Sequence, residues 1–114
     1  MYIQGTDVLK IGTITSTYRS ILLMGSDLGG LILLSITRAG NTSDATGIKV
    51  YGKSNDLKLY VDSNFTIYMQ SMSGHLTQPI AYHSGSNSSD VLYMNKIESL
   101  PSGVVELTVT NTFA

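Results

Sequence analysis

Short apolar runs recur along the chain roughly every 8 to 12 residues, and clusters of Gly, Asn, Asp and Ser separate them. This spacing is typical of an all-β sandwich or barrel, and helix-forming patterns are nearly absent. We therefore predict an antiparallel, jelly-roll-like β-sandwich of about eight or nine short strands. The predicted strands are Val8–Ile14, Tyr18–Met24, Leu31–Arg38, Ile48–Lys53, Leu57–Asp62, Phe65–Ser71, Leu76–His83, Val91–Lys96 and Val104–Thr110.

Turn-forming residues lie between the predicted strands. Gly25–Gly30 can reverse the chain because glycine accepts positive φ, so Ile21–Leu34 is interpreted as two buried strands joined by a Gly-rich turn. Lys53–Asp56 and Asp62–Asn64 are short enough for hairpins. Pro79 has no N–H to donate, so its strand is expected to be an edge strand or a broken one.

Apolar and polar residues alternate within the three predicted strands between Ile48 and Ser71. Alternation sends one set of side chains to each face of a sheet, so the aliphatic set is expected to build a core. If these strands form a meander, Tyr51, Tyr60 and Tyr68 share one outward face. Such a face suits a subunit contact or a platform for sugar rings, because tyrosine buries apolar area yet keeps a hydroxyl. Scattered surface tyrosines that support cross-strand pairs are the alternative.

Composition narrows the function classes. The 114 residues fit one domain, so a single β-sandwich over residues 1–114 is expected. Charged residues make up 13% of the chain and the net charge is -1, which argues against a polycationic nucleic-acid binder or a polybasic membrane-surface module. Because Cys is absent, disulfides, Cys-ligated zinc and a thiol nucleophile are excluded. Glycine and polar residues interrupt the longest apolar stretch, so no membrane insertion is expected.

Residues that support catalysis or metal binding form no clear motif. His75 and His83 would lie more than about 20 Å apart on one strand, too far to share a metal within one chain. A ring of histidines around an oligomer axis stays open, although ordinary surface histidines are favoured. The sequence contains no nucleophile elbow and no phosphate-binding loop. We therefore expect no enzyme activity, no cofactor and no metal.

From Gly47 to Ala114 the chain resembles the C-terminal head, or tip, domains of tailed-bacteriophage tail fibres. The segments that carry this resemblance are Leu57–Val61, Phe65–Met69, Ser99–Gly103 and the closing strand Val104–Thr110. The resemblance implies a β-sandwich that forms a homotrimer and whose distal loops bind a bacterial surface glycan or protein. It also implies a location in the virion, outside the bacterial cell, and suggests that the chain is the C-terminal fragment of a longer fibre. No receptor-binding residue carries over from the family.

The leading hypothesis is a non-catalytic receptor-binding tip that attaches to a bacterial surface polysaccharide or outer-membrane protein. Tyr51, Tyr60 and Tyr68 are the candidates for the subunit or ligand contact face. The candidate ligand-binding residues of the polar loops are Asn41, Asp44, Asn87 and Asp90. Two alternatives remain: a structural trimerisation module of a virion or fibre, and a fragment of a glycan-depolymerising tailspike with carboxylates between subunits.

Overall fold

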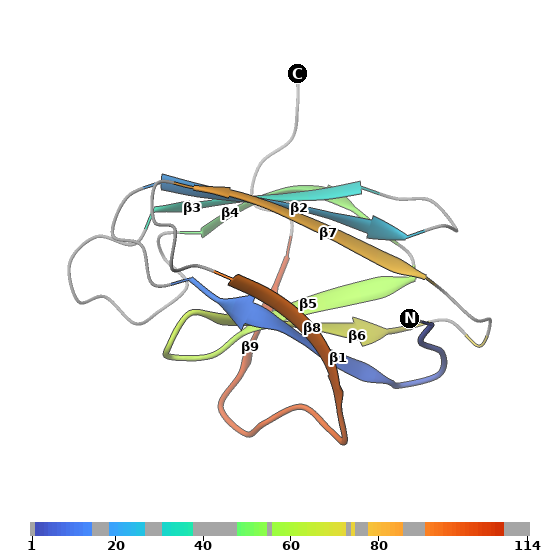
Figure 1. Cartoon of the computed structure of the whole chain (residues 1–114). Coiled ribbons are helices and arrows are strands. Elements are labelled where there is room, and N and C mark those ends of the chain that lie inside the picture. Colours follow the sequence, from blue (N-terminus) through green and yellow to red (C-terminus); the bar gives the residue numbers. More distant parts are fainter. Residues whose placement is uncertain are drawn as a thin grey trace.

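The computed structural model describes residues 2–14, 19–26, 31–37, 48–54, 56–72, 74, 78–85 and 91–108. Within these ranges the chain forms nine strands and no helix, and the strands build two antiparallel sheets that face each other (Figure 1). The predicted all-β, sandwich-like fold is therefore confirmed for the described residues. The strands are β1 (Val8–Thr13), β2 (Arg19–Ser26), β3 (Leu31–Thr37), β4 (Ile48–Lys53), β5 (Leu57–Val61), β6 (Thr66–Ser71), β7 (Pro79–Gly85), β8 (Val91–Ile97) and β9 (Val105–Leu107).

The first sheet has five strands in the order β8-β1-β6-β5-β9, and the second has four in the order β4-β3-β2-β7. The expected pairing on either side of Gly25–Gly30 is confirmed, since β2 and β3 are antiparallel neighbours. The hairpin at Asp62–Asn64 is also confirmed, because β5 pairs with β6. β7 lies at a sheet edge, as the missing N–H of proline led us to expect, and it begins at Pro79, which the prediction had placed inside the strand.

The predicted meander of β4, β5 and β6 is wrong. β4 pairs only with β3 among the described strands, and the connection at Lys53–Asp56 carries the chain to the other sheet instead of closing a hairpin. The reason is that alternation identifies a strand and its two faces but not the sheet it joins. β4 and β5 bury their aliphatic side chains in one core from opposite sides.

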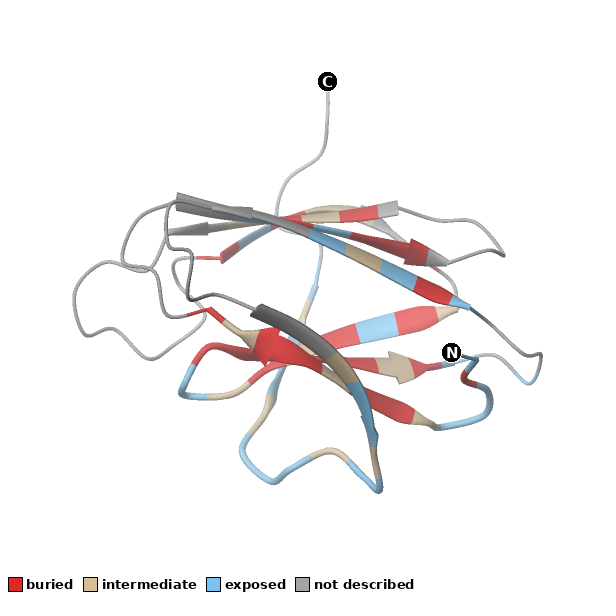
Figure 2. Ribbon diagram, in the orientation of Figure 1, coloured by how far each residue is buried: buried red, intermediate tan, exposed pale blue. Residues whose placement is uncertain are grey.

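Inward-pointing residues of both sheets fill this core, and Figure 2 shows the buried positions on both layers. Each fully buried aliphatic side chain contributes roughly 1.5–3 kcal/mol relative to an exposed one. The core residues are Ile3, Leu9, Ile11, Ile14, Leu22, Met24, Ile32, Leu34, Ile48, Val50, Leu57, Leu59, Val61, Phe65, Ile67 and Met69.

The connection between β8 and β9 runs along the outer side of the five-stranded sheet. These two strands lie at opposite edges of the five-stranded sheet, so residues 98–104 cross the face of that sheet that points away from the core (Figure 1). Val8, Thr66 and Tyr68 are buried at outward positions of this sheet: Val8 is 1% exposed and Thr66 and Tyr68 are each 5% exposed, although none belongs to the core cluster. Residues 98–104 are called the crossover below.

Candidate functional site

A row of apolar side chains runs across the outer face of the four-stranded sheet. Tyr51 of β4 is paired with Leu33 of β3, Leu33 with Leu23 of β2, and Leu23 with Tyr82 of β7. On β4 and β2, the residue before the row residue belongs to the core, and on β3 the residue after Leu33 does. Because side chains alternate along a strand, the four row residues point away from the core. With strands about 4.8 Å apart, the row is roughly 14 Å long.

Two further isoleucines extend this row into a patch. Ile21 lies on the same side of β2 as Leu23, and Ile80 lies on the same side of β7 as Tyr82. We call the outward-pointing side chains of Ile21, Leu23, Leu33, Tyr51, Ile80 and Tyr82 the apolar face.

The apolar face is open to solvent, most of all on β7. Tyr82 is 70% exposed and Ile80 59%, while Ile21 is 40% and Leu23 37% exposed. Leu33 and Tyr51 are half-buried between their neighbours on the sheet. Single exposed apolar residues are common on protein surfaces, but a contiguous group of them marks a contact surface. This patch is the candidate site that the described part of the chain supports best.

The three tyrosines chosen from the sequence do not share one face. Tyr51 belongs to the apolar face, whereas Tyr60 and Tyr68 are direct cross-strand partners in the five-stranded sheet. Tyr60 is half-buried and its hydroxyl donates to Gln70 Oε1 at 3.4 Å. The correction follows from the topology, because β4 lies in the opposite sheet from β5 and β6.

Tyr68 is a buried structural residue on the outer face of the five-stranded sheet. Its hydroxyl donates to Asp62 Oδ2 at 3.0 Å. Burial, followed by the hydrogen bond and the negative charge of Asp62, raises the pKa of Tyr68 to about 12. A phenol that keeps its proton and has its hydroxyl bonded within its own chain offers little to an external ligand.

Asp62 organises the hairpin that places Tyr68. Its Oδ1 accepts hydrogen bonds from the main-chain N–H groups of Asn64 (2.8 Å) and Thr66 (3.0 Å). Phe65, which the sequence placed in a strand, occupies the turn at φ 61, and its N–H donates to the Asp62 carbonyl at 3.1 Å. This left-handed conformation is unusual for a bulky residue, and the complete burial of the Phe65 ring in the core offsets its strain.

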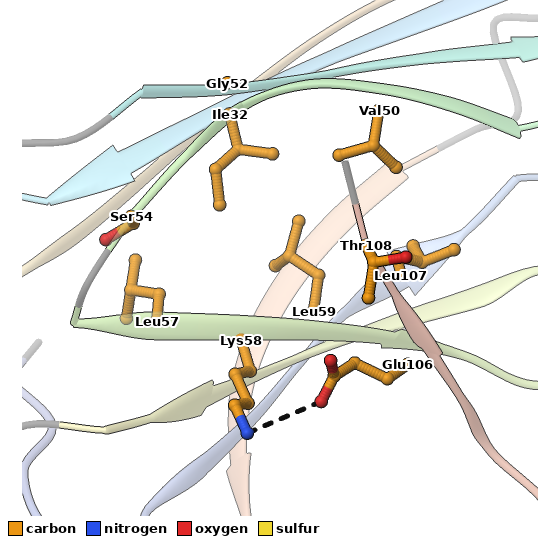
Figure 3. Close-up of a pocket in the computed structure, with 10 residues that line it drawn as sticks. All are labelled: Ile32, Val50, Gly52, Ser54, Leu57, Lys58, Leu59, Glu106, Leu107 and Thr108. Carbon is orange, nitrogen blue, oxygen red and sulfur yellow. Dashed lines mark ion pairs between the residues drawn. The ribbon is translucent and has the colours of Figure 1, made fainter. Parts of the chain in front are cut away.

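A cavity of about 520 Å³ opens between the sheets beside β4, β5 and β9. Ile32 and Val50 point into it from the four-stranded sheet, and Leu57 and Leu59 point toward them from β5 (Figure 3). The remaining lining residues are Gly52, Ser54, Lys58, Glu106, Leu107 and Thr108. The cavity walls are therefore mainly aliphatic.

Charged pairs are few and exposed in the described chain. Lys58 Nζ lies 3.5 Å from Glu106 Oε1, on the side of β5 away from Ile32 and Val50 (Figure 3). Lys96 Nζ lies 3.4 Å from Asp7 Oδ2. The hydrogen bond from the Gln4 N–H to Asp7, followed by the Lys96 charge, lowers the pKa of the Asp7 carboxyl. The first pair links β9 to β5, and the second links β8 to the residue before β1.

The described residues contain no group of three His, Asp or Glu side chains placed to hold a metal ion. No helical segment able to span a bilayer occurs in the same part of the chain. Asn41, Asp44, Asn87 and Asp90, the loop residues chosen from the sequence, lie outside the described residues, as does His75.

Sequence interpretation missed most of the apolar face. Its signal was present in two apolar runs without alternation, Ile21–Met24 and Leu31–Leu34. An unbroken apolar run is typical of a strand buried on both sides, and that is how these runs were interpreted. In the structure one side of β2 is buried and the other is exposed, so the prediction of two buried strands is wrong for Ile21 and Leu23.

Comparisons with known proteins give no relative. No protein-family model, no curated protein and no solved structure matches this chain.

Proposed function

We propose that this chain is a non-catalytic receptor-binding tip of the tail-fibre kind, which attaches to a polysaccharide or protein on the bacterial surface. The single observation that carries the proposal is the apolar face. A sheet with one face on the core normally turns polar side chains to water on the other. Here the outward positions of β2, β3, β4 and β7 carry, beside polar residues such as Ser35 and Lys49, a contiguous set of aliphatic and aromatic side chains, as expected of a contact surface.

The chemistry of the row suits recognition without reaction. Tyr51 and Tyr82 stand at its two ends, and Leu23 and Leu33 lie between them. Tyrosine rings cover the C–H faces of sugars or pack on apolar side chains, and their hydroxyls exchange hydrogen bonds with the ligand. A row roughly 14 Å long matches a short stretch of glycan or one strand of a protein surface.

The homotrimer and the jelly-roll-like head are part of the same proposal, as is a place in the virion. In chain order, the paired strands β2 and β7 both lie between the paired strands β1 and β8, and this arrangement supports the jelly-roll-like part of the proposal. Three copies around an axis would multiply weak contacts with a repetitive bacterial surface. Each site then needs only modest affinity.

Binding to a panel of bacterial strains with defined surface glycans tests the proposal. The wild-type chain is expected to bind a subset of strains, and Tyr82→Ser combined with Leu23→Ser is expected to abolish that binding. Val105→Ser is the matched control, because Val105 is an exposed apolar residue of β9 outside the apolar face. Absence of binding to every strain, or unchanged binding by the double variant, contradicts the proposal.

Two additions to the same assay identify the receptor class and separate the alternatives. Competition by purified polysaccharide indicates a glycan receptor, and loss of binding after protease treatment of the cells indicates a protein. Shortened polysaccharide chains after incubation would instead favour the depolymerising tailspike fragment.

A structural trimerisation module is the second candidate, favoured by the aliphatic centre of the apolar face at Leu23 and Leu33. A trimer that depends on these two residues and binds no strain would support it.

A further inference from the structure

The four edge strands of the sandwich differ in how they are protected. An edge strand exposes main-chain N–H and C=O groups that can pair with another chain, and proteins block such edges with charges, bulges or short strands. β4 and β7 end the four-stranded sheet, and β8 and β9 end the five-stranded sheet, within the described part of the chain.

Three of these edges carry a blocking feature. β4 contains Lys49 and Lys53, and Gly52 between them adopts φ 81. β8 contains Lys96, its register against β1 shifts, and Met94 adopts φ 51. β9 is only three residues long.

β7 carries none of these features. It runs for seven residues, Pro79–Gly85, and contains His83 but no Asp, Glu, Lys or Arg. Its pairing with β2 continues without a register shift from Ser26 to Ser20. Pro79 stands at the first position, where its missing N–H interferes least with pairing. β7 is thus a regular edge without a permanent charge, beside the most exposed part of the apolar face.

We propose that β7 pairs antiparallel with β7 of a second copy of this chain, about a twofold axis at Tyr82. Tyr82 is the middle residue of β7, so this register pairs the strand over its whole length and sets the two Tyr82 side chains next to each other. The two four-stranded sheets then form one sheet of eight strands. Antiparallel pairing keeps outward residues outward, so the row from Tyr51 to Tyr82 continues into the same row of the second copy.

A second copy is the occupant that this edge fits. Twofold pairing needs a self-complementary surface, and an axis at Tyr82 places His83 opposite Ala81 of the second copy, so no two like charges are directly paired. An edge roughly 23 Å long, with its flanking side chains, buries on the order of 500 Å² per copy, which brings the pair to about the 1,000 Å² of a small specific interface. Such a pair associates in a concentration-dependent manner.

The pairing is independent of the proposed attachment and compatible with a trimer. Three identical edges around a threefold axis cannot pair with one another, because each β7–β7 contact needs its own twofold axis. If the chain forms trimers through other surfaces, β7 therefore joins two trimers. In either case the assembly contains an even number of copies.

Sedimentation between low and high micromolar concentration tests the pairing. We expect a shift toward an even multiple of 12.3 kDa. Ala81→Lys is expected to abolish the shift, because Ala81 points inward on β7 and a lysine there places a charge at the edge. Met94→Lys is the matched control at the blocked β8 edge, since Met94 is likewise partly buried against the core. A wild type that stays monomeric or trimeric, or an even assembly that survives Ala81→Lys, overturns the proposal.

Single cysteines provide a second readout that does not depend on how well Ala81→Lys folds. The chain has no Cys, so Tyr82→Cys and Leu23→Cys each introduce one thiol. Cross-strand partners have Cβ atoms about 4.5–5.5 Å apart, so Tyr82→Cys is expected to form a disulfide dimer rapidly under mild oxidation. Leu23 lies on the same face one strand away and is expected to cross-link slowly. Equal rates for the two variants overturn the pairing. Ala81→Lys leaves the apolar face intact, so its binding to bacteria is scored separately.

Discussion

The outer faces of the two sheets of this sandwich differ in how exposed their apolar and aromatic side chains are. The five-stranded sheet has the crossover over its outer face, and Val8 and Tyr68 are buried there. The four-stranded sheet leaves Ile80 and Tyr82 exposed on its own outer face. Tyr68 is therefore buried within the fold and Tyr82 is available for contact, although both lie at outward positions of regular strands. The difference shows that an outward position in a sheet does not by itself make a binding residue.

The largest expected effect separates these two tyrosines by stability. Tyr68→Ala removes a buried ring and its hydrogen bond to Asp62, and is expected to lower the free energy of unfolding by about 3–5 kcal/mol. Tyr82→Ala is expected to change it by less than about 0.5 kcal/mol, because its ring is mostly in water. Urea unfolding of the two variants measures both values. Equal losses would mean that the two outer faces do not differ as described.

A smaller effect comes from the crossover itself. Gly103 lies in it at φ 83, a conformation that costs a residue with a Cβ about 1–2 kcal/mol. Gly103→Ala is therefore expected to destabilise the chain by about that amount, although no atom lies within 4 Å of the added Cβ. Gly74→Ala is the control, since Gly74 has the same open space without a positive φ. If thermal unfolding finds the two variants equally stable, backbone conformation does not hold the crossover.

Alkaline pH is expected to lower the free energy of unfolding through the titration of Tyr68. In the folded chain the pKa of Tyr68 is raised to about 12, whereas in the unfolded chain it returns to about 10. Between these values the unfolded chain binds fewer protons, so the free energy of unfolding falls as pH rises from 10 to 12. The contribution is fully present below pH 10.

Tyr68→Phe removes this titration and costs about 1 kcal/mol at neutral pH through the lost hydrogen bond. Its alkaline decline in stability is expected to be shallower than that of the wild type. Tyr60→Phe, on the same face, is expected to keep the wild-type decline. A decline of the same slope in all three proteins would show that Tyr68 does not carry it.

The smallest effect concerns the ion pair that links β5 to β9. Lys58 and Glu106 are both well exposed, so Lys58→Gln is expected to cost less than about 0.5 kcal/mol, and added salt is expected to reduce even that. Unfolding in low and high salt measures it. A larger loss would mean that the pair anchors β9, and with it the end of the crossover.

Local sequence predicts the strands and the pairing across short turns, but not which sheet each strand joins. Alternation identified the strand Ile48–Lys53, because the inward residues Ile48 and Val50 alternate with Lys49 and Tyr51. It also predicted the hairpin at Asp62–Asn64, where short polar residues favour a turn. It could not show that β4 and β5 lie in different sheets, because both assignments bury the same aliphatic side chains.

The sequence did not reveal the apolar face for a related reason. The apolar runs around Leu23 and Leu33 predict burial, and only the topology shows that nothing in the described chain covers one side of them. Conversely, Tyr68 looks exposed from its polar neighbours Thr66 and Gln70 along β6. Its burial is not visible in this local pattern, and the turn-forming residues of the crossover do not indicate which face they cross.

Hydroxyl-radical footprinting of the tyrosines tests the contrast between the two outer faces most directly. In dilute wild-type protein Tyr82 is expected to react rapidly and Tyr68 slowly, and binding to a recognised strain or self-association is expected to protect Tyr82 while Tyr68 stays unchanged. If Tyr68 reacts as fast as Tyr82, or if Tyr82 reacts equally in the free and bound states, the apolar face is not the contact surface of this protein.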